Sequence, residues 1–179
     1  MSKLILLTTM TVDGVTTVGE WYVSEGEHDR AARDQFVEAA GMVLGRKTYE
    51  GLAGYWSSET GEWADQLNPM PKFVASRTLE GPLEWNSTLI EGDATQGVEK
   101  LKAELHGDLL LIGCGDFASH LLGHGLIDEL RFWVHPAVWG SGERPFEGDE
   151  QIRLKLLDSR TFDSGVTLLR YEPEATGQD

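Results

Sequence analysis

The stretch Met42-Val43-Leu44-Gly45-Arg46-Lys47-Thr48-Tyr49-Glu50 is the part of this 179-residue chain that decides its fold. Its apolar half runs into a glycine, and two cations and a hydroxyl follow at the predicted start of a helix. A buried strand that ends there would bring Arg46, Lys47 and Thr48 to the edge of a sheet, where the unpaired N–H groups of the new helix favour an anion. The stretch therefore predicts a phosphate-binding strand–turn–helix unit. The alternative is an ordinary junction whose glycine and basic residues serve packing and solubility.

Two later stretches repeat this pattern. Phe73-Val74-Ala75 is a short apolar run that leads into the hydroxyl of Ser76 and the guanidinium of Arg77. Leu109-Leu110-Leu111-Ile112 is another, and it runs into Gly113-Cys114-Gly115-Asp116-Phe117. Open α/β sheets bind ligands at the carboxyl ends of their strands. Three strands with phosphate-compatible ends therefore predict one extended anion laid across that edge of the sheet.

Strands and helices alternate along most of the chain, which predicts an α/β fold with a mostly parallel sheet and right-handed crossovers. The last third is predicted to form longer, antiparallel strands over Glu129–Trp139, Leu154–Phe162 and Val166–Tyr171, with Asp163-Ser164-Gly165 as a hairpin turn. No repeat or linker is present, so we expect one domain over residues 1–172 and a polar C-terminal tail over residues 173–179.

Helices are predicted at two positions near the amino-terminal third. Ser24-Glu25-Gly26-Glu27 has the capping-box spacing and predicts a helix that extends to about Ala40. A second helix is expected from Thr48 to Tyr55. The polar stretch Trp56–Asn68 is assigned no element.

The net charge of −15 excludes nucleic acids and anionic membranes as expected partners, because binding to either depends on basic surfaces. No apolar run is long enough to span a bilayer and no signal-like N-terminus is present, so a cytoplasmic protein is expected.

Cys114 is the only cysteine in the sequence. We interpret it as a small residue that is tolerated where the backbone approaches a bound ligand closely, and a reactive thiol is the alternative. His120 and His124 have a helical metal-ligand spacing but no accompanying Glu, so no metal site is expected.

Several motifs together resemble a known family. They are Gly45-Arg46-x-Thr48, Ser76-Arg77, Ile112-Gly113-x-Gly115, Leu126–Arg131, Pro136–Gly142 and Leu157–Gly165. The first three resemble the NADPH-binding segments of the dihydrofolate reductase fold. All six resemble the reductase domain of the bifunctional riboflavin-biosynthesis deaminase–reductase and its stand-alone bacterial relatives. The resemblance covers roughly Lys3 to Tyr171.

The resemblance implies a three-layer α/β/α fold of the dihydrofolate reductase type, NADPH as cofactor, a homodimer, and reduction of a small pyrimidine- or pterin-like substrate. The residues that it assigns to the cofactor are Thr9, Gly45, Arg46, Lys47, Thr48, Ser76, Arg77, Gly113, Cys114, Gly115, Asp116 and Phe117. The residues that it assigns to the substrate are Asp13, Trp21, Leu52 and Trp56. For Asp116, capping of the following helix is the structural alternative.

Asp29 is the expected catalytic residue, because a carboxylate on this helix faces the pterin in dihydrofolate reductases. Such a group could bind an amidine-like heterocycle or support proton delivery. The alternative is a first-turn aspartate that the helix dipole favours.

The segment Asp13–Val23 corresponds in the resembled family to a flexible flap beside the nicotinamide. Its glycines and threonines are typical of a mobile lid that excludes water from hydride transfer, with Trp21 closing it. An ordinary surface loop with Trp21 packed on the core is the equal alternative.

The sequence departs from the family at two places. The run Asp-Asp-Pro-x-Leu of the riboflavin-pathway reductases reads Thr48-Tyr49-Glu50-Gly51-Leu52-Ala53 here, and the Met/Leu-Pro-Trp pattern of the dihydrofolate reductase lid is missing. Three function classes therefore stay open. They are a reductase similar to 5-amino-6-(5-phosphoribosylamino)uracil reductase, a dihydrofolate reductase proper, and a nucleotide-binding protein without catalytic activity.

Overall fold

The structure is a computed structural model that describes residues 1–146 and 151–174, and these residues form eight strands and five helices. The strands are β1 (Leu4–Thr11), β2 (Gly41–Gly45), β3 (Lys72–Ala75), β4 (Ser87–Leu89), β5 (Leu109–Ile112), β6 (Glu129–His135), β7 (Leu154–Thr161) and β8 (Thr167–Pro173). The helices are α1 (Gly26–Val37), α2 (Arg46–Trp56), α3 (Glu62–Leu67), α4 (Ala94–Glu104) and α5 (Asp116–Gly123).

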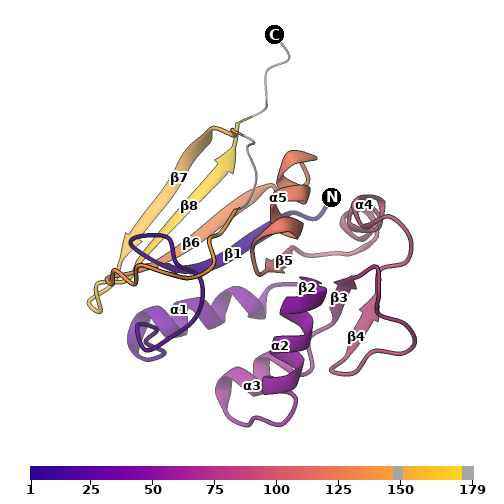
Figure 1. Cartoon of the computed structure of the whole chain (residues 1–179), viewed down its shortest axis with the longest axis horizontal. Coiled ribbons are helices and arrows are strands. Elements are labelled where there is room, and N and C mark those ends of the chain that lie inside the picture. The colour runs from indigo at the N-terminus through magenta and orange to yellow at the C-terminus, as the bar shows by residue number, and fades with distance from the viewer. Residues whose placement is uncertain (147–150, 175–179) are drawn as a thin grey trace. The chain divides into compact units, whose positions relative to one another are not determined.

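The eight strands form one mixed sheet in the order β4-β3-β2-β5-β1-β6-β8-β7 (Figure 1). The pairs β3–β4, β2–β3, β2–β5 and β1–β6 are parallel, and the pairs β6–β8 and β7–β8 are antiparallel. The predicted α/β fold, a mostly parallel sheet with an antiparallel C-terminal hairpin, is therefore confirmed.

The chain divides into two compact units. Unit 1 comprises Met1–Leu4 and Ala32–Ile112, and unit 2 comprises Ile5–Ala31 and the described residues from Gly113 onward. The single domain expected over residues 1–172 stays a prediction. Strand β8 continues to Pro173, the first residue of the predicted tail, and residues 175–179 of that tail lie outside the described residues.

Strand β2 is the buried centre of unit 1. Its first four residues, Gly41–Leu44, are buried, and it is flanked by parallel strands on both sides. Met42 aligns with Lys72 of β3 and with Leu110 of β5. A strand covered on both faces is expected to be continuously apolar, as this one is.

Helix α3 corrects the sequence analysis, which assigns no element between Trp56 and Asn68. The structure has a helix over Glu62–Leu67, and its buried residues are Ala64 and Leu67. Two apolar positions three residues apart share one helical face, but they make too short a pattern to reveal a helix. The burial that stabilises α3 comes from the rest of unit 1.

Lys72, the first residue of β3, has a fully buried side chain. Its Nζ donates to the carbonyl oxygens of Leu67 at 2.6 Å and Asn68 at 3.0 Å, and it lies 3.9 Å from the ring centroid of Trp85. Burial lowers the pKa of Lys72 to about 8, so the ammonium is still charged at neutral pH. It therefore acts as a buried cation at the C-terminal end of α3, where the helix dipole favours positive charge.

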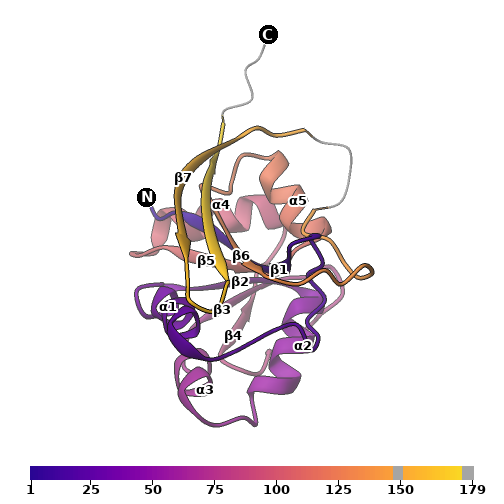
Figure 2. The same ribbon diagram turned by 90° about the vertical axis from the view of Figure 1, so that its left-hand side faces the viewer.

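Unit 2 contains the antiparallel part of the sheet. Strands β1 and β6 are aligned in parallel from Ile5 opposite Glu129 to Thr11 opposite His135. Strands β7 and β8 form a long hairpin (Figures 1 and 2). Its turn is closed by the Gly165 N–H, which donates to the carbonyl of Phe162 at 2.9 Å. The predicted turn at residues 163–165 is confirmed.

A buried carboxylate ties β6 to β8. Glu129 is 2% exposed, and its Oε1 accepts from Nε of Arg131 and from Nε of Arg170, both at 2.7 Å. Burial alone would raise the pKa of Glu129, but the two guanidinium hydrogen bonds outweigh it and lower the pKa. The carboxylate is therefore charged and paired, which is the condition under which a buried charge is tolerated.

Lys72→Met keeps most of the buried stem and removes the ammonium, so the carbonyls of Leu67 and Asn68 lose a charged donor. We expect the free energy of unfolding to fall by about 1–3 kcal/mol, measured by urea denaturation. Lys47→Met removes an exposed lysine of the same unit and should change stability by less than about 0.5 kcal/mol. Equal losses of unfolding free energy in the two variants would show that the buried contacts of Lys72 do not stabilise the fold more than an exposed lysine does.

Candidate functional site

The carboxyl ends of β2 and β3 meet in register in unit 1. Gly45 aligns with Ala75, so the residues that follow them, Arg46 and Ser76, begin at the same edge of the sheet. Helix α2 starts directly at Arg46, and its N-cap Gly45 has extended backbone (φ −77°, ψ 162°). No described side chain caps this helix, so the N–H groups of its first turn are available to an anion.

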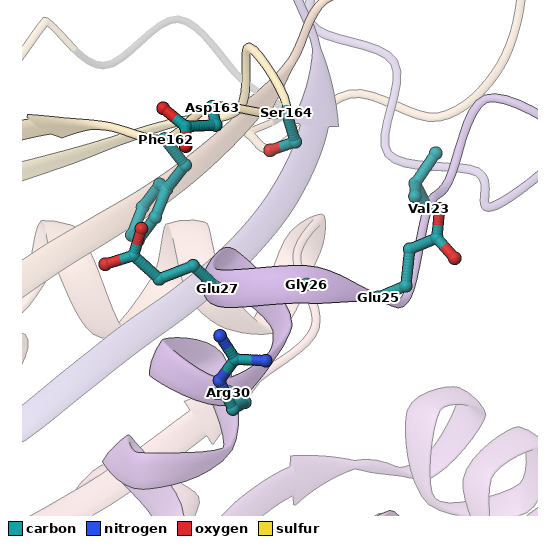
Figure 3. Close-up of a pocket in the computed structure, with 8 residues that line it drawn as sticks. All are labelled: Val23, Glu25, Gly26, Glu27, Arg30, Phe162, Asp163 and Ser164. Carbon is teal, nitrogen blue, oxygen red and sulfur yellow. The ribbon is translucent and has the colours of Figure 1, made fainter.

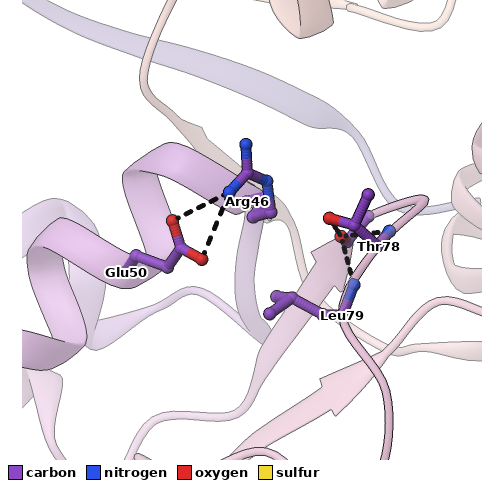
Figure 4. Close-up of polar contacts among 5 residues, drawn as sticks. Arg46, Glu50, Thr78 and Leu79 are labelled. Atoms are coloured by element: carbon purple, nitrogen blue, oxygen red, sulfur yellow. Dashed lines mark hydrogen bonds and ion pairs between the residues drawn. The ribbon is translucent and has the colours of Figure 1, made fainter.

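Ser76 shapes the turn that follows β3. Its Oγ accepts from the backbone N–H groups of Thr78 at 3.1 Å and Leu79 at 3.0 Å (Figure 4). A side chain that bonds the backbone two and three residues ahead fixes a tight turn. The turn leaves Arg77 exposed beside the end of β3. Ser76 thus fixes the turn that carries Arg77, and its contact with the cofactor stays a prediction.

Arg46 is paired along its own helix. Its Nη1 lies 3.3 Å and 3.4 Å from the two carboxylate oxygens of Glu50, and both side chains are nearly half exposed (Figure 4). An exposed pair of this kind contributes about 0–1 kcal/mol. A phosphate at the helix N-terminus can therefore compete for this guanidinium.

The predicted substrate residues of unit 1 lie farther along α2. Leu52 and Trp56 are half-buried, and the Trp56 ring packs edge-on against Tyr55 with centroids 5.0 Å apart. Trp56 is the last residue of the helix, and its backbone is about 15 Å along the axis from that of Arg46, at about 1.5 Å of rise per residue. The structure brings Arg46, Lys47 and Thr48 together with the Ser76 turn, and it does not bring Trp56 to them.

The third predicted phosphate segment has a glycine pair, Gly113 and Gly115, which lies at the start of the second stretch of chain in unit 2. Gly113 and Gly115 have positive φ angles of 103° and 82°, which side chains with a Cβ rarely adopt. A Cβ built on Gly115 would meet nothing within 4 Å, so there is open space beside this backbone. The Gly115 N–H donates to the carbonyl of Pro145 at 3.0 Å. The loop therefore has the shape and the clearance for a ligand to approach its backbone.

Helix α5 begins at Asp116, and its N-cap is Gly115. The alternative of Asp116 as the capping residue is therefore wrong, because Asp116 lies one position inside the helix. In this first turn, the helix dipole still stabilises a negatively charged carboxylate. Asp116 is exposed and Phe117 is half-buried. The thiol of Cys114 lies 3.3 Å from Oγ1 of Thr16, so this loop contacts the segment after β1.

The segment Asp13–Val23 is held in place by the loop that follows β6. The Asp13 carboxylate accepts from the N–H groups of Trp139 at 3.0 Å and Gly140 at 2.7 Å, and from the hydroxyl of Thr11 at 2.6 Å. These hydrogen bonds, that of Thr11 first, lower the pKa of Asp13 to about 2. Its carboxylate has a structural use here, and its contact with substrate stays a prediction.

Trp21 packs inward from the same segment. Its side chain is buried, its Nε1 donates to the carbonyl of Thr17 at 3.0 Å, and its ring lies edge-on to His135 with centroids 5.2 Å apart. This is the arrangement of the ordinary-loop alternative. Thr9, the other predicted residue of this region, is half-buried on β1 opposite Trp133 of β6.

Asp29 lies in the first turn of α1 with a buried side chain. Its Oδ1 accepts from Oγ of Ser24 at 2.7 Å, so Ser24 does not act as the predicted cap of a helix that in fact begins at Gly26. Tyr22 interacts with both Asp29 and Ser24. Burial, and secondarily the charge of Asp29, raise the pKa of the Tyr22 phenol, and a hydrogen bond with Ser24 opposes this rise. Asp29 is thus part of a small polar cluster.

Two histidines lie beside this cluster and were not assigned a functional role from the sequence. His28 is 3% exposed and His135 is 2% exposed, with ring centroids 5.8 Å apart. Burial, and secondarily the nearby His28, lower the pKa of His135 to about 4, so this ring is neutral at pH 7. The signal available in the sequence was the adjacency of His28 to Asp29, but only the fold brings residue 135 to them.

Among the described residues, no group of histidine, cysteine and carboxylate side chains could hold a metal ion. None of the described helices is long and apolar enough to cross a membrane.

Comparison with known sequences identifies one family. Residues 2–168 match the sequence profile of the RibD C-terminal domain. The uncharacterized protein YyaP of Bacillus subtilis (strain 168) is 34% identical over 101 residues, which are 56% of this chain and 53% of that protein. The match therefore spans about half the length of this relative.

Solved structures share the fold. A Shewanella sp. PV-4 protein provisionally assigned to riboflavin biosynthesis superposes with a TM-score of 0.76 at 19% identity, over 96% of this chain and 99% of that one. Dihydrofolate reductase from Enterococcus faecalis, solved with NADP(H), gives a TM-score of 0.64 at 13% identity over 96% of each chain. The dihydrofolate reductase-like fold that the sequence implied is confirmed.

Asp13→Asn tests the carboxylate clamp. An amide has one acceptor oxygen and no charge, so the Trp139 and Gly140 N–H groups should exchange with solvent faster, measured by NMR at neutral pH. In the wild type, the folded-state pKa is lowered, so the clamp is present above the ordinary aspartate range and is lost only as pH falls through about 2. Titration of the two amide shifts near 3.8, the ordinary pKa of an aspartate, would contradict this. Glu20→Gln, an exposed carboxylate of the same segment, is the control.

Proposed function

The chain belongs to the RibD C-terminal domain family, and we propose that it is an oxidoreductase that takes a hydride from NADPH and transfers it to a small heterocyclic substrate. The observation that carries the proposal is the edge of unit 1 where β2 and β3 end in register. An uncapped helix N-terminus lies there together with the cations Arg46, Lys47 and Arg77.

This set of donors fits the phosphates of a dinucleotide. The first-turn N–H groups of α2 would bind a phosphate directly, and the guanidinium of Arg77 can bind one through two parallel hydrogen bonds. In unit 2, the positive φ and open space at Gly115 would admit a pyrophosphate to the backbone. Each feature belongs to one of the segments that resemble the family's cofactor motifs.

The same cations favour NADPH over NADH as the cofactor. The two cofactors differ by one phosphate on the adenosine ribose, and arginine is the side chain best suited to recognise that group. Arg46 would exchange its exposed pairing with Glu50 for the phosphate, at little cost in free energy. The acidic excess of the chain does not prevent this, because local charge determines binding at a site.

The bound cofactor supplies the hydride, and the chain's own residues supply orientation, exclusion of water and a proton-binding group. Asp29 is the proposed contact to the substrate, since a buried carboxylate can accept hydrogen bonds from the N–H edge of a pyrimidine or pterin. Trp21 would keep water out by closing the segment 13–23 inward.

The pyrimidine of the riboflavin pathway is the first candidate substrate, because the reductases that the chain resembles act on it. Dihydrofolate is the second, since the fold is shared with dihydrofolate reductase. A protein that binds the nucleotide without catalysis is the remaining class.

Thermal-shift titration with NADPH and NADH at matched salt tests the proposal. A ligand at about one hundred times its Kd adds about 2.7 kcal/mol of stability, which raises the melting midpoint measurably. We expect a larger rise with NADPH than with NADH. No rise with either nucleotide would remove the reductase proposal.

Two variants at the helix N-terminus make this titration specific. Arg46→Met should weaken NADPH binding, whereas Glu50→Gln frees the guanidinium and should tighten binding by up to about fivefold, the equivalent of one exposed ion pair. Arg153→Met removes an exposed positive charge of unit 2 and is the control for net charge.

NADPH consumption then separates the three classes. The substrates to compare are 5-amino-6-(5-phosphoribosylamino)uracil and dihydrofolate. If Asp29 is the proton-handling group, Asp29→Asn should lower kcat with the active substrate by about a hundredfold. Equal rates would end that role, and NADPH binding without consumption of either substrate would favour the non-catalytic class.

We also propose a homodimer formed through β7. This strand is paired on one side by β8, and its Leu156 and Leu157 are 52% and 42% exposed. An edge strand with exposed apolar residues is a template for another chain. Light scattering should give the mass of a dimer for the wild type and a lower mass for Leu156→Glu. Val37→Glu, at an exposed valine outside β7, should leave the mass unchanged, and a monomeric wild type would end the proposal.

A further inference from the structure

The chain is tied back on itself at the start of α1 by two side-chain hydrogen bonds. Nε2 of His28 lies 2.8 Å from the carbonyl oxygen of Val23, and Oγ of Ser24 donates to Asp29 at 2.7 Å. Val23, the last residue of the segment 13–23, and Ser24 after it are therefore joined to two consecutive residues of the first helical turn. Because a carbonyl can only accept, Nε2 of His28 carries the proton.

The second ring nitrogen of His28 reaches a distant part of the chain. Its Nδ1 lies 3.0 Å from Oγ of Ser164, in the turn between β7 and β8. With the proton on Nε2, Nδ1 accepts from this hydroxyl in the neutral ring. One imidazole thus joins three segments, which are the end of the segment 13–23, the first turn of α1 and the β7–β8 turn.

The ring of His28 is also fixed by packing. It lies edge-on to His135 at 5.8 Å and to Phe162 at 6.2 Å between centroids, and it is 3% exposed. Close-packed neighbours on these sides leave the ring little freedom to turn, so its two hydrogen bonds hold their direction.

The two partners of His28 line a pocket of about 570 Å³ that opens to solvent. Figure 3 shows its two walls. Phe162, Asp163 and Ser164 come from the hairpin, and the opposite wall is formed by Val23 and Glu25, which precede α1, and by Gly26, Glu27 and Arg30 of α1. Apart from the His28 contact, Glu27 links the two walls through its ion pair with Arg160 of β7 at 2.5 Å, and both of these side chains are about half exposed. Of these two links, the buried imidazole is the one that is shielded from solvent.

We propose that His28 is a positioning residue, which couples the segment 13–23 and the orientation of Asp29 to the turn between β7 and β8. When the Ser164 bond is made, the imidazole holds the carbonyl of Val23, and Ser24 next to it holds the carboxylate of Asp29. When the hairpin turn moves, the segment 13–23 loses the support that His28 gives to the carbonyl of Val23. The part of this inference that concerns catalysis rests on the proposed role of Asp29.

Hydrogen exchange measured by mass spectrometry on the whole chain without nucleotide tests the coupling. Ser164→Ala removes one hydroxyl on the hairpin, and we expect the amides of residues 13–24 to exchange roughly two- to tenfold faster, the range that corresponds to one net hydrogen bond. His28→Phe keeps a packed ring and removes both bonds, so exchange should rise in residues 13–24 and in residues 162–166. The double variant should behave like His28→Phe alone, because the two changes remove the same link.

Two further variants separate this coupling from a general loss of stability. Ser164→Thr keeps the hydroxyl and should restore slow exchange. Ser159→Ala makes the same substitution on an exposed position of the same hairpin and should have no effect on residues 13–24. Wild-type exchange of residues 13–24 in Ser164→Ala, or additive effects in the double variant, would overturn the proposal.

The test does not depend on the reductase proposal. Exchange rates report on the coupling whether or not NADPH binds, and the thermal shift with NADPH reports on the cofactor site whether or not His28 couples the segments. For an active enzyme, Ser164→Ala should lower kcat with little change in the NADPH-induced shift. Unchanged kcat alongside faster exchange would confine the coupling to the loop and remove Asp29 from it.

Discussion

The burial of β2 between two parallel neighbours is the constraint on which the candidate cofactor site of unit 1 depends. Met42, Val43 and Leu44 are buried, and the register of β2 with β3 aligns Gly45 with Ala75. Because parallel strands end at the same edge, the residues after each strand are brought together without any contact between their side chains. The cations of α2 and of the Ser76 turn gain their common location from the strand register.

Buried charges in both units are tolerated because each is paired with hydrogen-bonding partners. The ammonium of Lys72 has two carbonyl acceptors and an aromatic face, and the carboxylate of Glu129 has two guanidinium donors. An unpaired charge in either place would carry several kcal/mol of desolvation cost. These two groups join neighbouring elements: Lys72 holds the end of α3 to β3, and Glu129 holds β6 to β8.

The segment after β1 shows how polar side chains can hold a loop that has few apolar residues to bury. Asp13 binds the backbone after β6, and His28 binds the end of the same segment and the β7–β8 turn. Hydrogen bonds to a charged or shielded group are stronger than those of exposed neutral groups, so few are needed. Opening of such a segment would require the loss of these identifiable hydrogen bonds.

The sequence by itself determined the α/β class and the alternation of most of the strands and helices, because apolar runs, glycines and turn residues are local signals. It also determined the antiparallel hairpin and the family, each of which depends on residue types at short spacings, and it predicted three strand ends that bind phosphate. The tertiary structure alone decided which polar groups meet. Ser164 and His28 are 136 positions apart, and Asp13 binds residues 126 and 127 positions away. Helix α3 and the buried state of Lys72 were decided in the same way, since burial depends on neighbours that only the folded chain supplies. A local pattern fixes what an element is, whereas hydrogen bonds between distant residues depend on the register and packing of the whole unit.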